Sequence, residues 1–77
     1  MPHPGSTPAM TRMARIVRES RDAHGWSQMD LAERAGVSRP SIARIEGGED
    51  VSTATLVKVA QAIGLMLVVQ EERSTGL

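Results

Sequence analysis

Residues 27–48 have the sequence SQMDLAERAGVSRPSIARIEGG, and this stretch decides how the chain folds. Ser27 and Asp30 have the spacing of a capping box, in which each side chain accepts a hydrogen bond from the backbone N–H of the other residue. Gly36 can end the helix that they begin, because glycine adopts a left-handed backbone at little cost. Ser38 is again suited to the N-cap position. The stretch therefore predicts two short helices joined by a sharp turn.

The apolar residues of this stretch recur at helical spacing, so one side of each short helix can be buried. They are Leu31, Ala32 and Ala35 before the turn, Val37 within it, and Ile42 and Ile45 after it. Pro40 is compatible with the second of these helices because it lies in the first turn, where N–H groups have no helical partner. Gly47 and Gly48 end that helix. Two short helices at this spacing have the layout of a helix-turn-helix.

The flanking sequence predicts two more helices, which makes the expected fold all-α. The first begins near Thr7 or Thr11, either of which can cap it, and runs to about His24. The last follows Ser52 as its cap and is closed by Gly64. Its predicted buried side chains are Leu56, Val59, Ala60 and Ile63.

The two ends of the chain differ from its middle. Residues 1–10 are rich in proline and small polar residues, which predicts a flexible N-terminal arm. Residues 11–70 form the predicted domain, and residues 71–77 a frayed tail. Residues 65–70, LMLVVQ, are apolar on both sides and favour a short β-strand, with a fifth short helix as the alternative.

A lone strand leaves both of its edges unpaired, and the sequence predicts no second strand to cover them. Antiparallel pairing with the same segment of a second copy would satisfy the free backbone groups. We therefore expect a homodimer. The residues predicted to make this contact are Leu65, Leu67, Val68 and Val69.

Composition excludes several kinds of chemistry. The 77 residues are enough for one small domain, and the lack of cysteine excludes disulfides, a cysteine-ligated zinc site and a thiol nucleophile. The two histidines, His3 and His24, cannot hold a metal alone, and the sequence contains no recognisable catalytic set or phosphate-binding glycine loop. The longest apolar run, at residues 65–69, is too short to cross a bilayer. We expect a cytoplasmic protein with no cofactor, no metal, no membrane partner and no enzymatic activity.

The net charge is zero, but the charges are unevenly distributed. Residues 12–44 contain seven arginines and four acidic residues, whereas residues 45–77 contain two basic and five acidic residues. A polyanion needs only a local basic surface, so the first part of the chain can meet the phosphates of a nucleic acid.

Residues 16–65 resemble the Cro/repressor-type helix-turn-helix family, also called the XRE family. The matching residues are Arg18, Arg21, Ser27, Gln28, Leu31, Ala32, Ala35, Gly36, Val37, Ser38, Ile42, Ile45, Glu46, Gly48, Leu56, Ala60, Ile63 and Gly64. The chain departs from the pattern at Gly47, and at Val51, where the family often has proline; both departures concern the loop before the last helix. The resemblance implies a repressor-like domain of four to five helices that binds double-stranded DNA, with the short C-terminal strand for dimerisation.

The outward side of the third predicted helix carries the candidate base-reading residues. Pro40, Ala43 and Arg44 lie roughly opposite the buried isoleucines, and Arg39 lies beside them at the N-terminus. In a helix-turn-helix this end of the recognition helix enters the major groove. Each arginine can present a fork of donors to guanine O6 and N7, and the proline and alanine can touch a thymine methyl group. The alternative is that both arginines contact phosphate or solvent.

The candidates for contact with DNA phosphates are Gln28, Ser27, Ser38, Arg18 and Arg15. Gln28 begins a helix, where free N–H groups and the helix dipole favour a phosphate, and the resemblance implies that it also buttresses the recognition helix. The two serines are mainly caps, with phosphate contact as a second role. For the two arginines, a solvated helix surface is the alternative.

The resemblance also implies a structural salt bridge between Arg21 and Glu46, which would join the first helix to the end of the third. Trp26 precedes the Ser27 cap and is expected to pack as a hydrophobic staple against the second helix. His24 is expected to lie on the surface near a helix end. We assign Arg21 and Glu46 to structure, and we expect no catalytic role for His24 or Trp26.

These features predict a sequence-specific transcriptional repressor that binds a palindromic operator as a homodimer. A helix followed by a strand at the end of the domain resembles the HipB-like antitoxins, which repress their own operon and bind a toxin. An antitoxin with a cognate toxin as its partner is therefore an alternative. An interaction module that has the fold without tight DNA binding is another.

Overall fold

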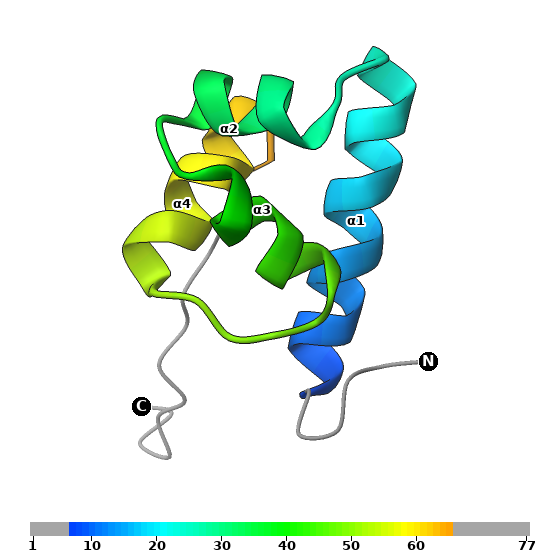
Figure 1. Ribbon diagram of the computed structural model, residues 1–77. Coiled ribbons are helices and arrows are strands. Elements are labelled where there is room, and N and C mark those ends of the chain that lie inside the picture. Colours follow the sequence, from blue (N-terminus) through cyan, green and yellow to red (C-terminus); the bar gives the residue numbers. More distant parts are fainter. Residues whose placement is uncertain (1–6, 66–77) are drawn as a thin grey trace, which may run out of the picture.

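The computed structural model describes residues 7–65 of the chain, which form four helices (Figure 1). These are α1 (Pro8–His24), α2 (Gln28–Ala35), α3 (Arg39–Glu46) and α4 (Thr53–Ala62). The described residues contain no strand, in agreement with the predicted all-α class. Apart from Leu65, the predicted strand and its alternative, the fifth helix, fall outside the described residues, as do the predicted tail and residues 1–6 of the predicted arm.

Each helix begins at a side-chain cap that satisfies a backbone N–H of its first turn. The hydroxyl groups of Thr7, Ser27, Ser38 and Ser52 each accept a hydrogen bond from the backbone N–H three residues further on. All four helix starts therefore follow from local sequence, since a hydroxyl at this position replaces a bond that the helix cannot make.

The start of α1 corrects one predicted boundary. The arm was predicted to extend to residue 10, but the helix already begins at Pro8, whose fixed backbone suits the first helical position. Met10, in this first turn, is buried at 6% exposure, and its backbone N–H donates to the Thr7 hydroxyl. Thr11, the alternative cap, lies inside the helix, where its hydroxyl donates to the Thr7 carbonyl.

The core lies where the four helices meet. Its largest fully buried side chains are Val17 from α1, Leu31 from α2, Ile42 and Ile45 from α3, and Val59 from α4. Removing each from water stabilises the fold by roughly 1.5–3 kcal/mol. Because α3 contributes two of the five, its inward side is held firmly.

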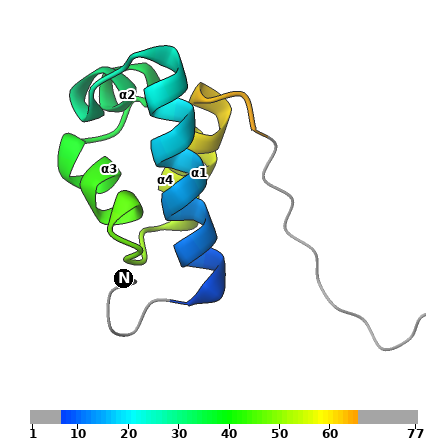
Figure 2. The same ribbon diagram turned by 90° about the vertical axis from the view of Figure 1, so that its right-hand side faces the viewer.

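The packing of the helices leaves the outer side of α3 open. This helix contacts α1 and α2, and α2 also contacts α4. Figure 2 shows α3 at one edge of the molecule, with no other described helix beyond it. Gly36, with φ at 72°, makes the turn between α2 and α3, so that α3 can lie across the front of the domain (Figure 1).

No helix in residues 7–65 has the length and apolar character needed to span a membrane. The same part of the chain has no cluster of three or more His, Asp or Glu side chains that could hold a metal ion.

Candidate nucleic-acid interface

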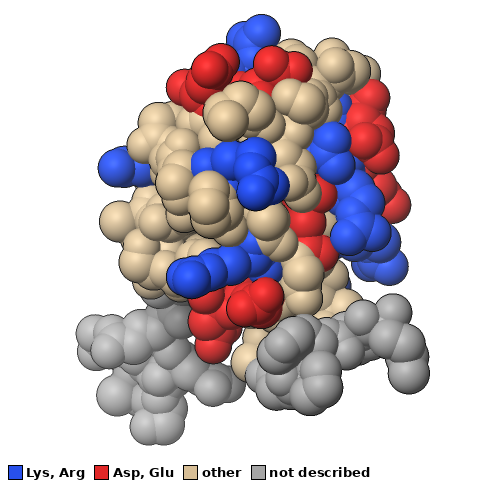
Figure 3. All heavy atoms as spheres, in the orientation of Figure 1, with Lys and Arg blue, Asp and Glu red and all other residues tan. Residues whose placement is uncertain are grey.

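The outer face of α3 presents the predicted base-reading residues. Arg39, Pro40 and Arg44 are exposed and Ala43 is half-buried. Both isoleucines of the helix are fully buried, so the helix cannot rotate this face away without exposing the core. In the space-filling view, basic side chains lie over α3 and over α1 on the same side of the molecule (Figure 3). The face combines two guanidinium groups with apolar surface, which is the chemistry that base edges in the major groove require.

The first turn of α3 is fixed by its cap. The Ser38 hydroxyl accepts from the backbone N–H of Ser41 at 3.3 Å and lies 2.9 Å from the Ser41 hydroxyl. Arg39 and Pro40 are the first two residues of the helix that follows. The side chains of Arg39 and Pro40 therefore project from the N-terminal end of α3, where the free N–H groups and the positive end of the helix dipole lie.

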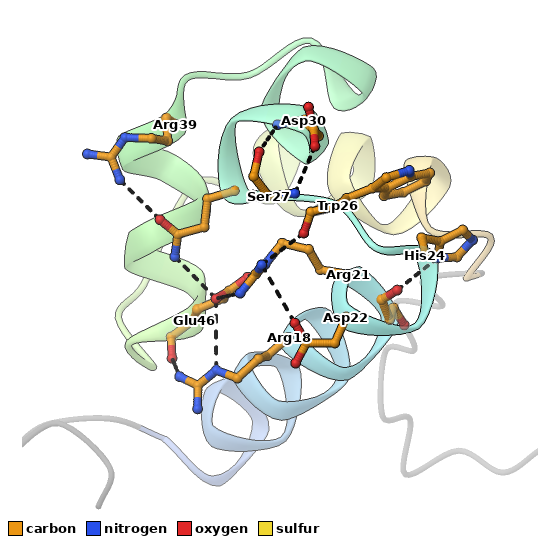
Figure 4. Close-up of polar contacts among 11 residues, drawn as sticks. Arg18, Arg21, Asp22, His24, Trp26, Ser27, Asp30, Arg39 and Glu46 are labelled. Atoms are coloured by element: carbon orange, nitrogen blue, oxygen red, sulfur yellow. Dashed lines mark hydrogen bonds and ion pairs between the residues drawn. The ribbon is translucent and has the colours of Figure 1, made fainter.

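A chain of hydrogen bonds joins the two ends of α3 through α2 (Figure 4). Nη1 of Arg39 donates to Oε1 of Gln28 at 3.0 Å, and Nε2 of Gln28 donates to Oε1 of Glu46 at 3.2 Å. Gln28 thus buttresses α3, as the family resemblance implied. Arginine has five N–H donors, so Arg39 keeps others for a base or a phosphate while this bond orients it.

Glu46 is the central acceptor of this network. Its side chain is only 5% exposed and accepts from Arg21 through Nε at 2.7 Å and Nη2 at 3.1 Å. Arg21 also donates to the carbonyl of Trp26 at 2.9 Å, which links the start of α2 to the same pair. The hydrogen bonds from Arg21 to Glu46 raise the arginine pKa, and no buried polar side-chain atom in residues 7–65 lacks a hydrogen-bond partner. The predicted salt bridge is present, in the two-pronged form that gives the strongest pairing.

The two predicted phosphate-contacting arginines of α1 line one groove. Arg15 and Arg18 are exposed, and the groove between α1 and the C-terminal end of α3 has a volume of about 470 Å³. Arg18 is partly engaged within the protein: it donates to the carbonyl of Glu46 at 3.1 Å and lies 3.9 Å from the Glu46 carboxylate. Nothing in the sequence signals this contact, because the two residues are 28 positions apart.

The start of α2 is held by the predicted capping box. The Ser27 hydroxyl accepts from the Asp30 N–H at 3.0 Å, and the Asp30 carboxylate accepts from the Ser27 N–H at 2.9 Å. The bond from the Ser27 backbone, with a smaller contribution from its hydroxyl, lowers the pKa of Asp30. The structure therefore places Ser27 and Gln28 together at the N-terminus of α2, next to Arg39.

Trp26 lies at the joint between α1 and α2, on the side away from Arg39 (Figure 4). It packs against the core, as the staple prediction required. Its ring stacks on His24 with centroids 4.1 Å apart, and the Arg34 guanidinium lies 4.3 Å from the ring centre. Sequence reasoning placed the tryptophan but missed both stacking partners, since neither contact follows a regular helical spacing.

An acidic loop adjoins the other end of the interface. Glu49 and Asp50 are exposed directly after α3, and acidic side chains gather there below the basic ones in Figure 3. The loop is tied to the helix, because the Glu49 N–H donates to the Arg44 carbonyl at 2.9 Å. Basic side chains therefore lie over α3 and α1, and acidic ones lie at the loop that follows α3.

Comparison with known families and proteins agrees with this geometry. Residues 17–67 match a family model described as helix-turn-helix. The chain is 26% identical to antitoxin HipB of Escherichia coli K12 over 67 residues, which cover 86% of this chain and 76% of HipB. It is 38% identical over 48 residues to a protein of Archaeoglobus fulgidus that carries the name of an HTH-type transcriptional regulatory protein. That alignment covers 62% of this chain but only 16% of the archaeal protein.

Solved structures show the same fold. A chain in the structure of a HipA-HipB-O2-O3 complex matches with a TM-score of 0.68 at 23% identity, covering 83% of this chain and 92% of the other. The restriction-modification controller protein C.AhdI from Aeromonas hydrophila matches with a TM-score of 0.67 at 30% identity, covering 78% and 92% of the two chains. The arrangement of α1 to α4 is therefore one that other chains of this size also adopt.

Proposed function

Since this chain belongs to the helix-turn-helix family, we propose that it is a sequence-specific DNA-binding transcriptional repressor that acts as a homodimer on a palindromic operator. In this proposal α3 enters the major groove with its N-terminus leading. Arg39, Pro40, Ala43 and Arg44 read bases. The candidates for the phosphate contacts are Gln28, Ser27, Ser38, Arg15 and Arg18, and the roles of the two arginines are separated below. The proposal includes no enzymatic step and no cofactor.

One observation supports this proposal above the others. The two arginines of α3 stay exposed while both of its isoleucines are fully buried. The open side of α3 thus carries two guanidinium groups, which are the donors that base edges and phosphates accept from. In addition, the Gln28 bond orients Arg39 before any ligand arrives, which lowers the entropy lost on binding.

The homodimer follows from the small size of one interface. A single recognition helix makes few base contacts, and two placed about 34 Å apart by a two-fold axis can bind a palindrome with useful affinity. The contact is proposed to come from Leu65 together with Leu67, Val68 and Val69. Leu65 lies three residues after the end of α4 and is 38% exposed, so its side chain is available to a second copy.

A gel-shift titration at two salt concentrations tests the proposal. The probes are the DNA upstream of the protein's own gene and a random duplex of equal length. Repression predicts a clear preference for the upstream DNA at both salt concentrations. A steep salt dependence with no preference would contradict sequence-specific repression, and weak binding to both probes would favour an interaction module.

Variants of α3 sharpen this test. Arg39→Gln is expected to lose about 1–3 kcal/mol of discrimination between the two probes, because one forked contact to guanine is removed. Lys58→Gln is the matched control, since it removes the same charge from an exposed position on α4. An equal effect of both variants would show that Arg39 contributes only general charge.

The similarity to antitoxin HipB, over most of both chains, favours a second candidate function. In that case the protein would repress its own operon and also bind a toxin encoded beside it. Co-expression with the product of the neighbouring gene, followed by size-exclusion chromatography, tests this. A stable complex that still binds the upstream DNA supports the antitoxin, whereas two separate peaks contradict it.

A further inference from the structure

The last carbonyl groups of α3 accept hydrogen bonds from two kinds of donor, the backbone of the following loop and a side chain of α1. The last four carbonyl groups of a helix have no partner within it, and a buried carbonyl without a partner is costly. The carbonyls of residues 43–45 accept from backbone N–H groups of the following loop at 2.9 to 3.1 Å. The fourth carbonyl, that of Glu46, accepts from Nη2 of Arg18 on a different helix. Glu46 as a whole is only 6% exposed, and the bond that its carbonyl accepts from Arg18 is partly buried.

Arg15, the neighbour of Arg18 on α1, differs from it in its contacts within the protein. Arg15 and Arg18 are three residues apart and line the same groove. Arg18 has its guanidinium engaged by both the carbonyl and the carboxylate of Glu46, with the side chain 58% exposed. Arg15 is exposed and, within residues 7–65, makes no hydrogen bond or ion pair. Arg15 can bind a phosphate without losing a contact within the protein. Arg18 can bind one only if it gives up its contacts with Glu46 at the C-terminal end of α3.

We propose that Arg18 is a positioning residue that holds the last turn of α3 against α1, and that Arg15 is the arginine of this pair that binds a DNA phosphate. The part concerning Arg18 stands on the structure alone, and the part concerning Arg15 rests on the proposed function. The role of Arg18 bears on DNA binding through Arg44, because Arg44 lies in the last turn of α3, which Arg18 holds. Arg18 therefore controls how accurately Arg44 is presented to a base without touching DNA.

Two matched variants separate these roles. Arg18→Gln and Arg15→Gln remove the same charge from the same helix and the same groove. Three quantities are measured for each: amide hydrogen exchange at residues 47–49, the salt dependence of binding to a random duplex, and the ratio of affinities for the upstream DNA and that duplex. Arg18→Lys serves as the conservative variant, since it retains the charge and one donor toward Glu46.

For Arg18→Gln we expect exchange at residues 47–49 to accelerate by roughly threefold to tenfold, because one hydrogen bond that closes the helix is lost. The affinity ratio should fall, and the salt slope should stay unchanged. Arg18→Lys should restore part of the protection and of the ratio. For Arg15→Gln we expect unchanged exchange and a salt slope that is smaller by about one unit.

The opposite pattern overturns the proposal. If Arg18→Gln lowers the salt slope by about one unit and leaves exchange unchanged, Arg18 is a phosphate contact and not a positioning residue. If Arg15→Gln leaves the salt slope unchanged, Arg15 is not the phosphate contact. If the unaltered protein binds neither DNA, the proposed function and the role of Arg15 fail together, while hydrogen exchange still decides the role of Arg18.

Discussion

Glu46 is a charged side chain in an environment where an unpaired charge is costly. Its carboxylate accepts from Arg21 and Gln28, and Arg18 approaches it as well. A buried pair of this kind contributes little over an apolar pair, but the loss of one partner leaves the other stranded. The pair with Glu46 therefore affects the free energy of unfolding most when one of the two partners is removed.

Arg21→Met is expected to lower the free energy of unfolding by about 3 kcal/mol, because the Glu46 carboxylate loses its two shortest hydrogen bonds. Urea denaturation followed by circular dichroism measures this. The double variant Arg21→Met with Glu46→Leu should regain most of the loss, since no buried charge remains. A single variant as stable as the unaltered protein would mean that water or Arg18 replaces Arg21 fully.

Asp30 gives the protein a defined response to acid. Its pKa is lower in the folded protein than its ordinary value of 3.8, mainly because it accepts from the Ser27 backbone N–H. The stabilisation is therefore fully present above that ordinary value and is lost as the pH falls through the lowered pKa. In Asp30→Asn the melting temperature should fall less steeply with acid below about pH 4 than in the unaltered protein. Parallel slopes for the two proteins would contradict this assignment.

At the scale of elements, the turn between α2 and α3 sets the angle of α3, the proposed recognition helix. Gly36 has φ at 72°, and a Cβ added there would have no heavy atom within 4 Å. Gly36→Ala should therefore cost about 1–2 kcal/mol from backbone strain alone, without a steric clash. Thermal denaturation measures the loss, and Gly36→Asn should cost less because asparagine tolerates this backbone better. Equal losses for the two would point to a cause other than φ.

The sequence predicted the elements well because their signals are local. The caps at Ser27, Ser38 and Ser52 lie next to the helices that they begin, and the capping box spans three residues. The start of α1 was harder, because Thr7 and Thr11 are both good caps. In the structure Thr7 is the cap and Thr11 lies inside the helix, and the spacing of the residues alone does not decide between them.

The candidate site was predictable in outline but not in detail. The spacing of the isoleucines was enough to place the outward side of α3. The bond from Arg39 to Gln28 and that from Arg18 to Glu46 connect different helices, so no periodicity reveals them. Sequence reasoning could therefore name the arginines but could not tell which of them is already engaged.

At the scale of the whole molecule, the proposed homodimer depends on the apolar segment after α4. Leu67→Lys would place a charge in the predicted contact, so we expect a monomer and much weaker binding to the upstream DNA. Sedimentation velocity measures the mass, and Gln61→Lys, at an exposed position on α4, is the control. A Leu67→Lys protein that remains a dimer would exclude this segment as the contact.

Trp26 gives the molecule a built-in optical reporter. The chain has one tryptophan and neither tyrosine nor phenylalanine, so all near-ultraviolet fluorescence comes from this ring. The ring is stacked on His24 and lies beside Arg34, on the side away from Arg39. Its emission should change when α1 and α2 separate and stay nearly constant when a ligand occupies α3. Unfolding and the proposed binding at α3 can thus be followed separately in one unlabelled sample.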